Sequence, residues 1–323
     1  MKQFCKEIAM AIMMGLVVPG VILGVMVSLR QYQQEAAPER IQIPEISDPE
    51  TQRCVSVLMD DGAVRRMLLK DYLTGVVLAE MPASFEIEAH KAQAVVARTY
   101  TLRAEKRGGR HEDATVCTDH TCCQAFVSED EYIQRGGTEE SIRKIRSAVE
   151  ETEGMVLTYE GDLIEATYFS CSGGWTEDAL AVWGTDVPYL QAVYSPGEEL
   201  ASHYTDTVTF TADEFANALS LNHEGNSEAW ISDIQYTSGG GVDYMVIQDV
   251  IFKGTVLRRL LNLHSTSISF RVEEDVITIT TRGYGHRVGM SQYGADAMAA
   301  AGLQYPEILA HYYRGTSLDK LED

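Results

Sequence analysis

Glu80 is the residue whose place in the sequence points most directly to chemistry. The helix predicted to lead up to it carries an apolar stripe made by Leu69, Tyr72, Leu73, Val76 and Val77. Glu80 falls on the same stripe, and Pro82 ends the helix just beyond it. Burial and the negative end of the helix dipole both raise a carboxyl pKa, which lets the acid keep a proton for a leaving oxygen at neutral pH. Helix phase alone equally allows a carboxylate that is paired with a nearby Lys or Arg.

A cluster of thiols and imidazoles forms a second candidate site. Cys117, Cys122 and Cys123 lie close together, while His111, Cys117 and Cys123 are evenly spaced along the chain with His120 among them. Imidazole nitrogens and thiolates are ligands that suit Zn²⁺. Outside the cytoplasm the same cysteines can form a disulfide, and their spacing does not decide between the two.

The helix predicted over residues 86–105 carries further polar side chains near Glu80 in the sequence. Two pairs lie two helical turns apart and so share faces: Lys91 with Arg98, and Gln93 with Tyr100. Charged residues on helices usually face water. Only the nearness of Glu80 makes these four residues candidates for substrate contacts.

The elements that would position these residues are of both kinds. Helical spacing is found at 68–80, 86–105, 139–151, 212–219 and 305–313. Short apolar or alternating stretches predict strands at 55–59, 155–159, 163–170, 208–210, 231–236, 244–252, 267–272 and 276–280. Strands and helices do not alternate regularly, so we predict an α+β fold whose helices and antiparallel strands form a substrate groove.

The part of the chain after residue 50 is expected to be one catalytic domain with an insertion. The stretch 203–262 differs from its surroundings, with a helix pattern and a hairpin-like pair around Gly239–Gly241. We interpret it as an inserted α+β subdomain. The catalytic domain would then comprise 51–202 and 263–323.

The N-terminal residues predict a membrane anchor. Residues 8–29 are apolar except for Ser28, and as a helix they would span about 33 Å, enough to cross a bilayer. Because basic residues precede the run, we expect a cytoplasmic tail at 1–7 and an extracytoplasmic catalytic domain. The run is too long for a typical cleaved signal peptide. Residues 30–50 are polar and contain three prolines, which is typical of a linker.

The composition excludes one class of partner. The chain has 323 residues, with 26 Lys and Arg against 48 Asp and Glu, for a formal net charge of -22. Nucleic acids are bound through clustered basic residues that neutralise phosphates. We therefore expect no nucleic acid partner.

Several blocks of sequence resemble the stage II sporulation protein D family. They are Val76–Phe85, Glu88–Tyr100, Tyr168–Glu177, Val182–Leu190 and Arg282–Ala295. Several long motifs in the right order make this resemblance specific, and with the anchor it covers nearly the whole chain. It implies a lytic transglycosylase that acts on peptidoglycan during forespore engulfment, with Glu80 as the catalytic glutamate.

The reaction implied by the resemblance cuts the bond between N-acetylmuramic acid and N-acetylglucosamine. The sugar's own 6-hydroxyl closes on the anomeric carbon and gives a 1,6-anhydro product, so one carboxyl group serves first as acid and then as base. A hydrolase would normally need a second carboxylate at a defined separation. By resemblance, the residues that would line the substrate groove are Lys91, Gln93, Arg98, Tyr100, His286, Ser291, Gln292 and Tyr293.

The resemblance also implies a metal and partners. Clostridial relatives hold zinc through a His and two Cys, which correspond to His111, Cys117 and Cys123 and leave the fourth position to water, Glu80, Cys122 or His120. The expected partners are stage II sporulation protein P, an amidase, and stage II sporulation protein M, a membrane protein, between the mother-cell and forespore membranes. Similar domains are also associated with a second role, that of a non-catalytic wall-binding activator of an amidase.

Two positions depart from the family pattern. Arg287 stands where Gly is common, so it would be strained if the turn needs a positive φ, or it would line the groove as a basic side chain. Cys171 stands where a hydroxyl side chain is usual, and a bond between Cys171 and Cys54 is a further alternative.

Overall fold

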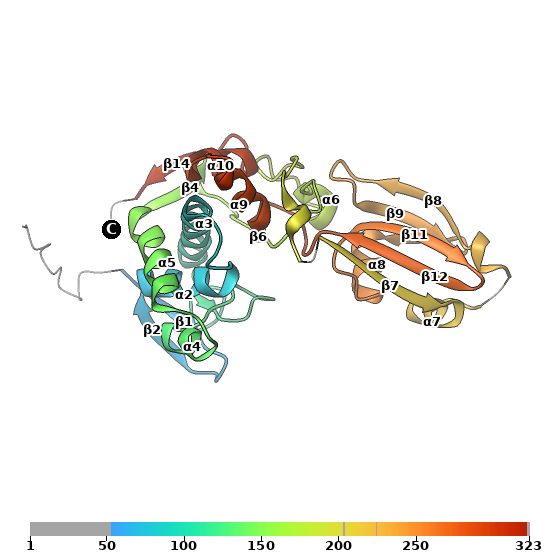
Figure 1. Ribbon diagram of the computed structural model, residues 1–323, viewed down its shortest axis with the longest axis horizontal. Helices are drawn as coiled ribbons and strands as arrows, with labels where there is room; N and C mark the ends of the chain where they lie inside the picture. Colours follow the sequence, from blue (N-terminus) through green and yellow to red (C-terminus); the bar gives the residue numbers. More distant parts are fainter. Residues whose placement is uncertain (1–52, 203, 224, 322–323) are drawn as a thin grey trace, which may run out of the picture. The chain divides into compact units, whose positions relative to one another are not determined.

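A computed structural model describes residues 53–202, 204–223 and 225–321 (Figure 1). The predicted tail, transmembrane helix and linker lie outside these residues. Within them, no helix combines the length and the apolar character that crossing a membrane requires. Helices and mostly antiparallel strands are mixed along the chain, which confirms the predicted α+β class.

The first group of elements surrounds the candidate acid. Strand β1 (Cys54–Leu58) pairs antiparallel with β2 (Val64–Leu68) and parallel with β3 (Val116–Cys117). The helices packed with them are α2 (Leu69–Glu80), α3 (Ile87–Lys106) and α5 (Glu139–Glu151). Helix boundaries match the prediction closely because each helix carries its own apolar stripe. The prediction missed β2, whose Val and Arg side chains are exposed.

Helix α3 is the central element of this part of the fold. It packs against α2, α5 and two helices near the C-terminus, α9 (Gln292–Ala300) and α10 (Tyr305–Tyr312). Most of its residues are buried, including a set of small ones, Ala89, Ala92, Ala94 and Ala97. A helix that is buried on most sides needs small side chains where its neighbours approach.

A second group of elements shares a core with α3. Strand β4 (Met155–Tyr159) lies between β14 (Ser317–Lys320) and β5 (Asp162–Leu163), and β6 (Tyr168–Phe169) pairs parallel with β13 (Met290–Ser291). A short helix, α6 (Ala179–Trp183), completes this group, whereas α4 (Glu129–Gln134) packs through Tyr132 on the first group. The strand predicted over 163–170 is therefore two strands. Between them the Glu165 N–H donates to the Tyr189 hydroxyl and the Thr167 N–H donates to the Glu165 carbonyl, so the regular strand pairing is interrupted.

A third core lies in the region that includes the predicted insertion. One sheet has the order β11-β12-β7 and another the order β10-β9-β8. Their bounds are β7 (Thr205–Thr211), β8 (Ile231–Tyr236), β9 (Val242–Ile247), β10 (Val250–Lys253), β11 (Ser267–Glu273) and β12 (Val276–Arg282), with α7 (Ala212–Ala218) and α8 (Gly254–Leu260). The buried residues of this core run from Ala212 to Ile279. The domain boundaries given above stay a prediction.

The stretch predicted as one strand over 244–252 is a hairpin. Gln248 and Asp249 have φ of 47° and 62°, and they connect β9 to β10. Two consecutive residues with positive φ form the tight turn that suits the twist of paired strands. The turn was missed because it lacks the Asn-Gly or Asp-Gly pair that usually marks it.

Candidate active site and metal centre

Glu80 is the last residue of α2 and is half-buried. Met81, which follows it, is extended with φ of -128° and ψ of 139° because it precedes Pro82. One carboxyl oxygen, Oε1, accepts a hydrogen bond from the Ala125 N–H at 2.8 Å and another from the Tyr168 hydroxyl at 2.9 Å. The end of α2 thus presents a carboxyl group with one oxygen fixed.

The two donors to Glu80 belong to a larger polar network. Gln124 donates from Nε2 to the Tyr168 oxygen at 3.3 Å. Its Oε1 accepts from the Thr101 hydroxyl at 3.1 Å and the Tyr72 hydroxyl at 3.4 Å. Because Gln124 is buried, these bonds tie α2 and α3 to the segment that carries the Ala125 N–H.

The environment shifts the pKa of Glu80 in the direction that the helix phase predicted. Burial raises the pKa above its ordinary value, while the bonds from Ala125 and Tyr168 and the nearby Gln292 amide act against this rise. Burial also raises the pKa of Tyr168 far above its ordinary value. Tyr168 therefore remains a hydrogen-bond donor at any physiological pH.

Gly75 allows the segment with Ala125 to approach α2 closely. The Val127 N–H donates to the Gly75 carbonyl at 3.2 Å. A Cβ on Gly75 would lie 2.3 Å from Phe126 Cε2 and 2.7 Å from the Val127 carbonyl oxygen. Only glycine fits at this helical position.

We expect Gly75→Ala to destabilise the protein and to reduce any activity that depends on Glu80. Alanine gains about 1 kcal/mol of helix propensity, but a clash with backbone costs about 1–3 kcal/mol or more in a packed interior. Relief of the clash must move the Val127 carbonyl, and with it the segment that holds Glu80. Chemical denaturation and a cleavage assay measure the two effects. A fully active variant with raised stability would contradict this expectation.

The candidate groove residues on α3 engage other groups of the protein. Lys91 pairs with Glu88 at 2.7 Å and Glu151 at 2.8 Å. Arg98 is buried and donates to the main-chain carbonyls of Val149 and Met155. It also donates to the Thr152 hydroxyl. Gln93 is fully buried, and its two amide atoms have no hydrogen-bond partner among the described residues. Their roles as substrate contacts stay predictions.

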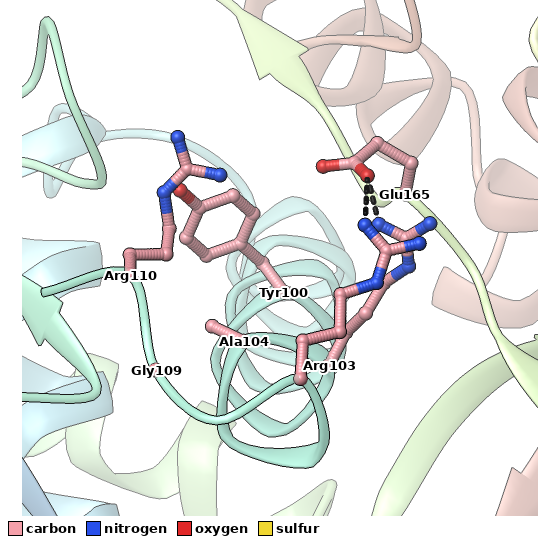
Figure 2. Close-up of a pocket in the computed structure, with 7 residues that line it drawn as sticks. Tyr100, Arg103, Ala104, Gly109, Arg110 and Glu165 are labelled. Carbon is pink, nitrogen blue, oxygen red and sulfur yellow. Dashed lines mark hydrogen bonds and ion pairs between the residues drawn. The ribbon is translucent and has the colours of Figure 1, made fainter.

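Tyr100 lines a pocket beside basic side chains (Figure 2). The guanidinium carbon of Arg110 lies 5.8 Å from the centre of the Tyr100 ring, within range of a cation–π interaction. The Tyr100 hydroxyl donates to the Cys122 carbonyl at 3.5 Å. On the other side of the pocket, Arg103 and Arg107 both contact Glu165. Tyr100 therefore connects this pocket to the cysteine cluster.

The glycine-rich block places its four candidate residues in different surroundings. His286 lies between the rings of Phe169 and Trp183, and burial lowers its pKa to about 4, so it is neutral at pH 7. Tyr293 packs edge-on against Phe85 at 4.9 Å. The remaining two are buried: Ser291 caps α9, and Gln292 lies near Glu80. Gln292 is thus the member of this block that lies beside the candidate acid.

Glu198 is a buried carboxylate that the sequence did not single out. Its Oε2 accepts from the main chain of the 172–174 turn, with the Ser172 N–H at 2.9 Å and the Gly173 N–H at 2.7 Å. Its Oε1 accepts from the hydroxyls of Ser195, at 2.7 Å, and Ser291. Glu198 thus joins two of the family-like blocks. The first of two acidic residues in a Pro-Gly-Glu-Glu stretch gives no sign that it will be buried.

Arg287 adopts the strained conformation and does not line a groove. Its φ is 66°, and its side chain is buried beside Glu177, with a guanidinium-to-carboxylate distance of 3.2 Å. It also donates to main-chain carbonyls of Ser172, Trp175 and Gly239, each at 2.7 Å. The basic side chain therefore fastens the 172–175 segment and the turn at Gly239 to its own turn.

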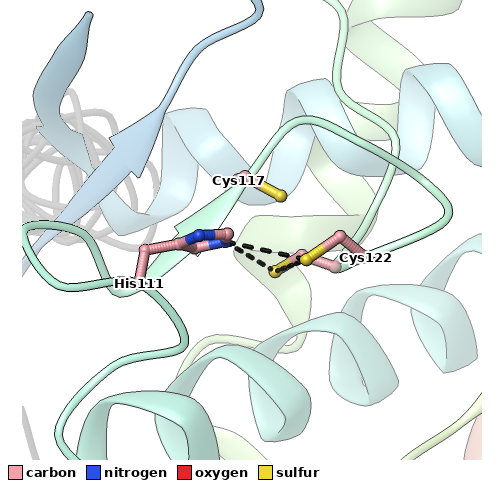
Figure 3. Close-up of side chains that lie close together, drawn as sticks. His111, Cys117 and Cys122 are labelled. Carbon is pink, nitrogen blue, oxygen red and sulfur yellow. Dashed lines mark hydrogen bonds between the residues drawn. The ribbon is translucent and has the colours of Figure 1, made fainter. Parts of the chain in front are cut away.

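The cysteine cluster is assembled in space (Figure 3). One donor atom from each of His111, Cys117, Cys122 and Cys123 lies within 4.8 Å of all the others. The His111 Nε2 is 3.6 Å from the Cys123 sulfur and 3.8 Å from the Cys122 sulfur. Thiolates and imidazole fit Zn²⁺, and the separations leave space for an ion among them. These four residues could hold a metal.

The cysteines of this cluster form no disulfide in the structure. Cys122 and Cys123 are consecutive, so their Cα atoms are about 3.8 Å apart, shorter than the usual range for a disulfide. All five cysteines among the described residues are thiols. Cys171 is buried against Glu198, with its sulfur 3.5 Å from Oε2, and this environment raises its pKa to about 12. Cys171 and Cys54 are not joined by a disulfide in the structure.

Comparison with known proteins agrees with the motif resemblance. A family model described as stage II sporulation protein matches residues 60–159. The chain is 39% identical over 264 residues to stage II sporulation protein D of Bacillus subtilis, covering 80% of this chain and 77% of the relative. It is 36% identical to the protein of the same name from Bacillus amyloliquefaciens, covering 80% and 76%. It is also 32% identical to the amidase enhancer of Bacillus subtilis, covering 76% of this chain and 40% of that protein.

Proposed function

Because this chain belongs to the stage II sporulation protein D family, we propose that it is a lytic transglycosylase that cleaves peptidoglycan glycan strands during sporulation. The observation that carries the proposal is the half-buried Glu80 carboxyl, with Oε1 held by Ala125 and Tyr168 and a pKa raised by burial. A carboxylic acid in such a place keeps its proton near neutral pH and presents it in a fixed direction.

The proposed reaction uses Glu80 twice. Oε1 already accepts two hydrogen bonds, so the acidic proton is on Oε2. That proton passes to the oxygen bridging N-acetylmuramic acid and N-acetylglucosamine while the bond to the anomeric carbon breaks. The carboxylate then takes the proton of the sugar's 6-hydroxyl while the 6-hydroxyl oxygen bonds to the anomeric carbon. Ala125 and Tyr168 stabilise the carboxylate between these steps.

The products of digestion test the reaction type directly. Purified glycan strands treated with the protein should yield fragments that end in 1,6-anhydro-N-acetylmuramic acid, as measured by mass spectrometry. A zinc-dependent hydrolase would instead give reducing ends that have gained water. Reducing ends as the main product would therefore contradict a lytic transglycosylase.

Tyr168→Phe is expected to move the activity profile to higher pH. The Tyr168 hydroxyl favours the charged carboxylate, so its loss raises the pKa of Glu80 further. Since the acid must be protonated to act, the fall in kcat/KM at high pH should occur at a higher pH than in the wild type. Tyr236, exposed on β8, offers a matched control as Tyr236→Phe. A high-pH limb that stays in place or moves to lower pH would argue against this role.

A second candidate function is that of a wall-binding protein that activates an amidase. The similarity to the Bacillus subtilis amidase enhancer favours it. Such an activator needs to bind peptidoglycan, but it needs no proton donor. Amidase stimulation that persists when the Glu80 carboxyl is replaced would support this function over the enzymatic one.

We also propose Zn²⁺ as a cofactor, held by His111, Cys117 and Cys123. The donor types and their mutual distances fit the ion. Bound zinc would supply a fixed divalent charge and a cross-link between loops that are separate in the sequence.

The proposed location follows from the apolar run at residues 8–29. That run would anchor the protein in the membrane, with the catalytic part between the mother-cell and forespore membranes and the N-terminus in the cytoplasm. We propose stage II sporulation proteins P and M as partners, because a shared membrane raises the effective concentration of proteins that act on one wall.

A further inference from the structure

The cysteine cluster has the dimensions of a tetrahedral site with four protein ligands. Zinc bonds of about 2.3 Å to sulfur and about 2.0–2.1 Å to nitrogen place tetrahedral ligands about 3.8 Å apart for two sulfurs and about 3.6 Å apart for sulfur and nitrogen. The Cys122 and Cys123 sulfurs are 3.9 Å apart, and the His111 Nε2 is 3.6 and 3.8 Å from them. Three of the distances between ligand atoms are therefore already close to the tetrahedral values, and two of these three distances involve the Cys122 sulfur.

We propose that Cys122 is the fourth protein ligand, which closes the metal site and makes it structural. This inference rests on the zinc proposed above. Sites with four protein ligands hold structure together, whereas catalytic zinc keeps a position open for water or substrate. The ion would then act on the glycan reaction through the backbone that it fixes.

The other protein candidates for the fourth position, Glu80 and His120, contribute no atom to the group of donors that lie within 4.8 Å of one another. The Oε1 atom of Glu80 is held by Ala125 and Tyr168. His120 is exposed, and its ring nitrogen lies 3.9 Å from an Asp119 carboxyl oxygen. The Cys122 sulfur, in contrast, already lies among the other donor atoms (Figure 3).

A closed site would hold the segment that positions Glu80. Cys117 ends β3, while Cys122 and Cys123 form a turn whose N–H groups both donate to the Asp119 carbonyl. The next two residues are Gln124, which bonds to Tyr168, and Ala125, which bonds to Glu80. Fastening this turn to β3 and to His111 therefore fixes the donors to the candidate acid.

Cobalt substitution of the full-length protein counts the thiolate ligands. Near-ultraviolet charge-transfer absorption of bound Co²⁺ rises with the number of thiolates, so Cys122→Ser should lose about one third of the wild-type signal if three thiolates bind. Competition with a chelator should show that Cys122→Ser binds zinc at least about tenfold more weakly than the wild type. Loss of a residue that only hydrogen-bonds to a metal ligand already has an effect of this size, and loss of a ligand should have at least as much. His120→Ala is the matched control and should change neither value.

Hydrogen exchange reads the structural part of the inference. Cys122→Ser should speed amide exchange in a peptide that covers residues 122–127, while a peptide from α5 is unchanged. A cobalt signal that falls in Cys117→Ser and Cys123→Ser but not in Cys122→Ser would overturn the inference and leave zinc as a cofactor. Failure of the wild type to bind either metal would overturn both. Neither result would bear on Glu80 as the acid.

Discussion

Glu80→Gln should abolish glycan cleavage almost completely, with a loss of about 10²- to 10⁴-fold in kcat, the range that a positioned general acid contributes. The amide has the size of the carboxyl group, and its oxygen can still accept from Ala125 and Tyr168. It has no proton of comparable acidity to give to the bridging oxygen. The variant should therefore bind purified glycan and keep its thermal stability while it releases no anhydro fragments.

Glu86→Gln is the matched control, since Glu86 is an exposed glutamate that lies near Glu80 in the sequence, at the start of α3. It should cleave at the wild-type rate. Glu80→Gln also separates the two candidate functions, because an amidase activator would stimulate its partner equally well with either residue. Cleavage by Glu80→Gln at more than a tenth of the wild-type rate would rule out Glu80 as the acid.

The parts of the site that were predictable are those encoded by local spacing. Helix α2 and its terminal Glu80 follow from the apolar stripe and Pro82, and α5 begins and ends at the predicted residues. The spacing of His111, Cys117 and Cys123 likewise indicated a cluster that is assembled in the structure. Local patterns of this kind depend on helix periodicity and ligand type, which a single sequence displays directly.

The parts that were missed depend on contacts between distant segments. The Ala125 N–H is a backbone group, which carries no signal in residue type, and Tyr168 lies far along the chain from Glu80. Glu198 is buried by turns that come from other blocks of the sequence. Arg98, whose position on α3 suggested an exposed basic face, points inward to carbonyl groups at the end of α5. Tertiary packing decides each of these cases.

Arg287 is a position where the sequence predicted the backbone conformation but not the reason that a non-glycine residue is tolerated there. The departure from glycine predicted strain, and the positive φ is present. What the sequence could not show is the buried carboxylate of Glu177 that pairs with the strained arginine. Strain at one residue persists when surrounding contacts compensate for it.

Replacing Arg287 should therefore destabilise the protein even when the new residue relieves the strain. Loss of one partner of a buried ion pair costs about 3–5 kcal/mol, because the other charge stays buried. Arg287→Met keeps the unfavourable backbone and should show the whole loss. Arg287→Gly removes strain of about 1–3 kcal/mol, so its free energy of unfolding should fall by less. Chemical denaturation midpoints measure both changes.

The loss should depend on pH in a defined direction. Burial already raises the pKa of Glu177, and removal of the guanidinium, which lowers it, raises the pKa further. A carboxyl whose pKa is higher in the folded state than in the unfolded state loses stability as pH rises through the folded value. Arg287→Gly should thus be more destabilised relative to wild type at pH 8 than at pH 5.

A second substitution identifies Glu177 as the cause. In Glu177→Gln with Arg287→Gly, neither residue of the former ion pair carries a charge, so the extra loss at pH 8 should disappear and part of the stability should return. The Gln oxygen can still accept from Thr237 and Gly241, which bond to Glu177 at 2.9 Å. Non-additive effects of the two changes are expected for residues in direct contact. The double variant could instead be as unstable as the sum of the single ones, with the pH dependence unchanged. That result would place the cost in the lost bonds to the Ser172, Trp175 and Gly239 carbonyls and not in the buried charge.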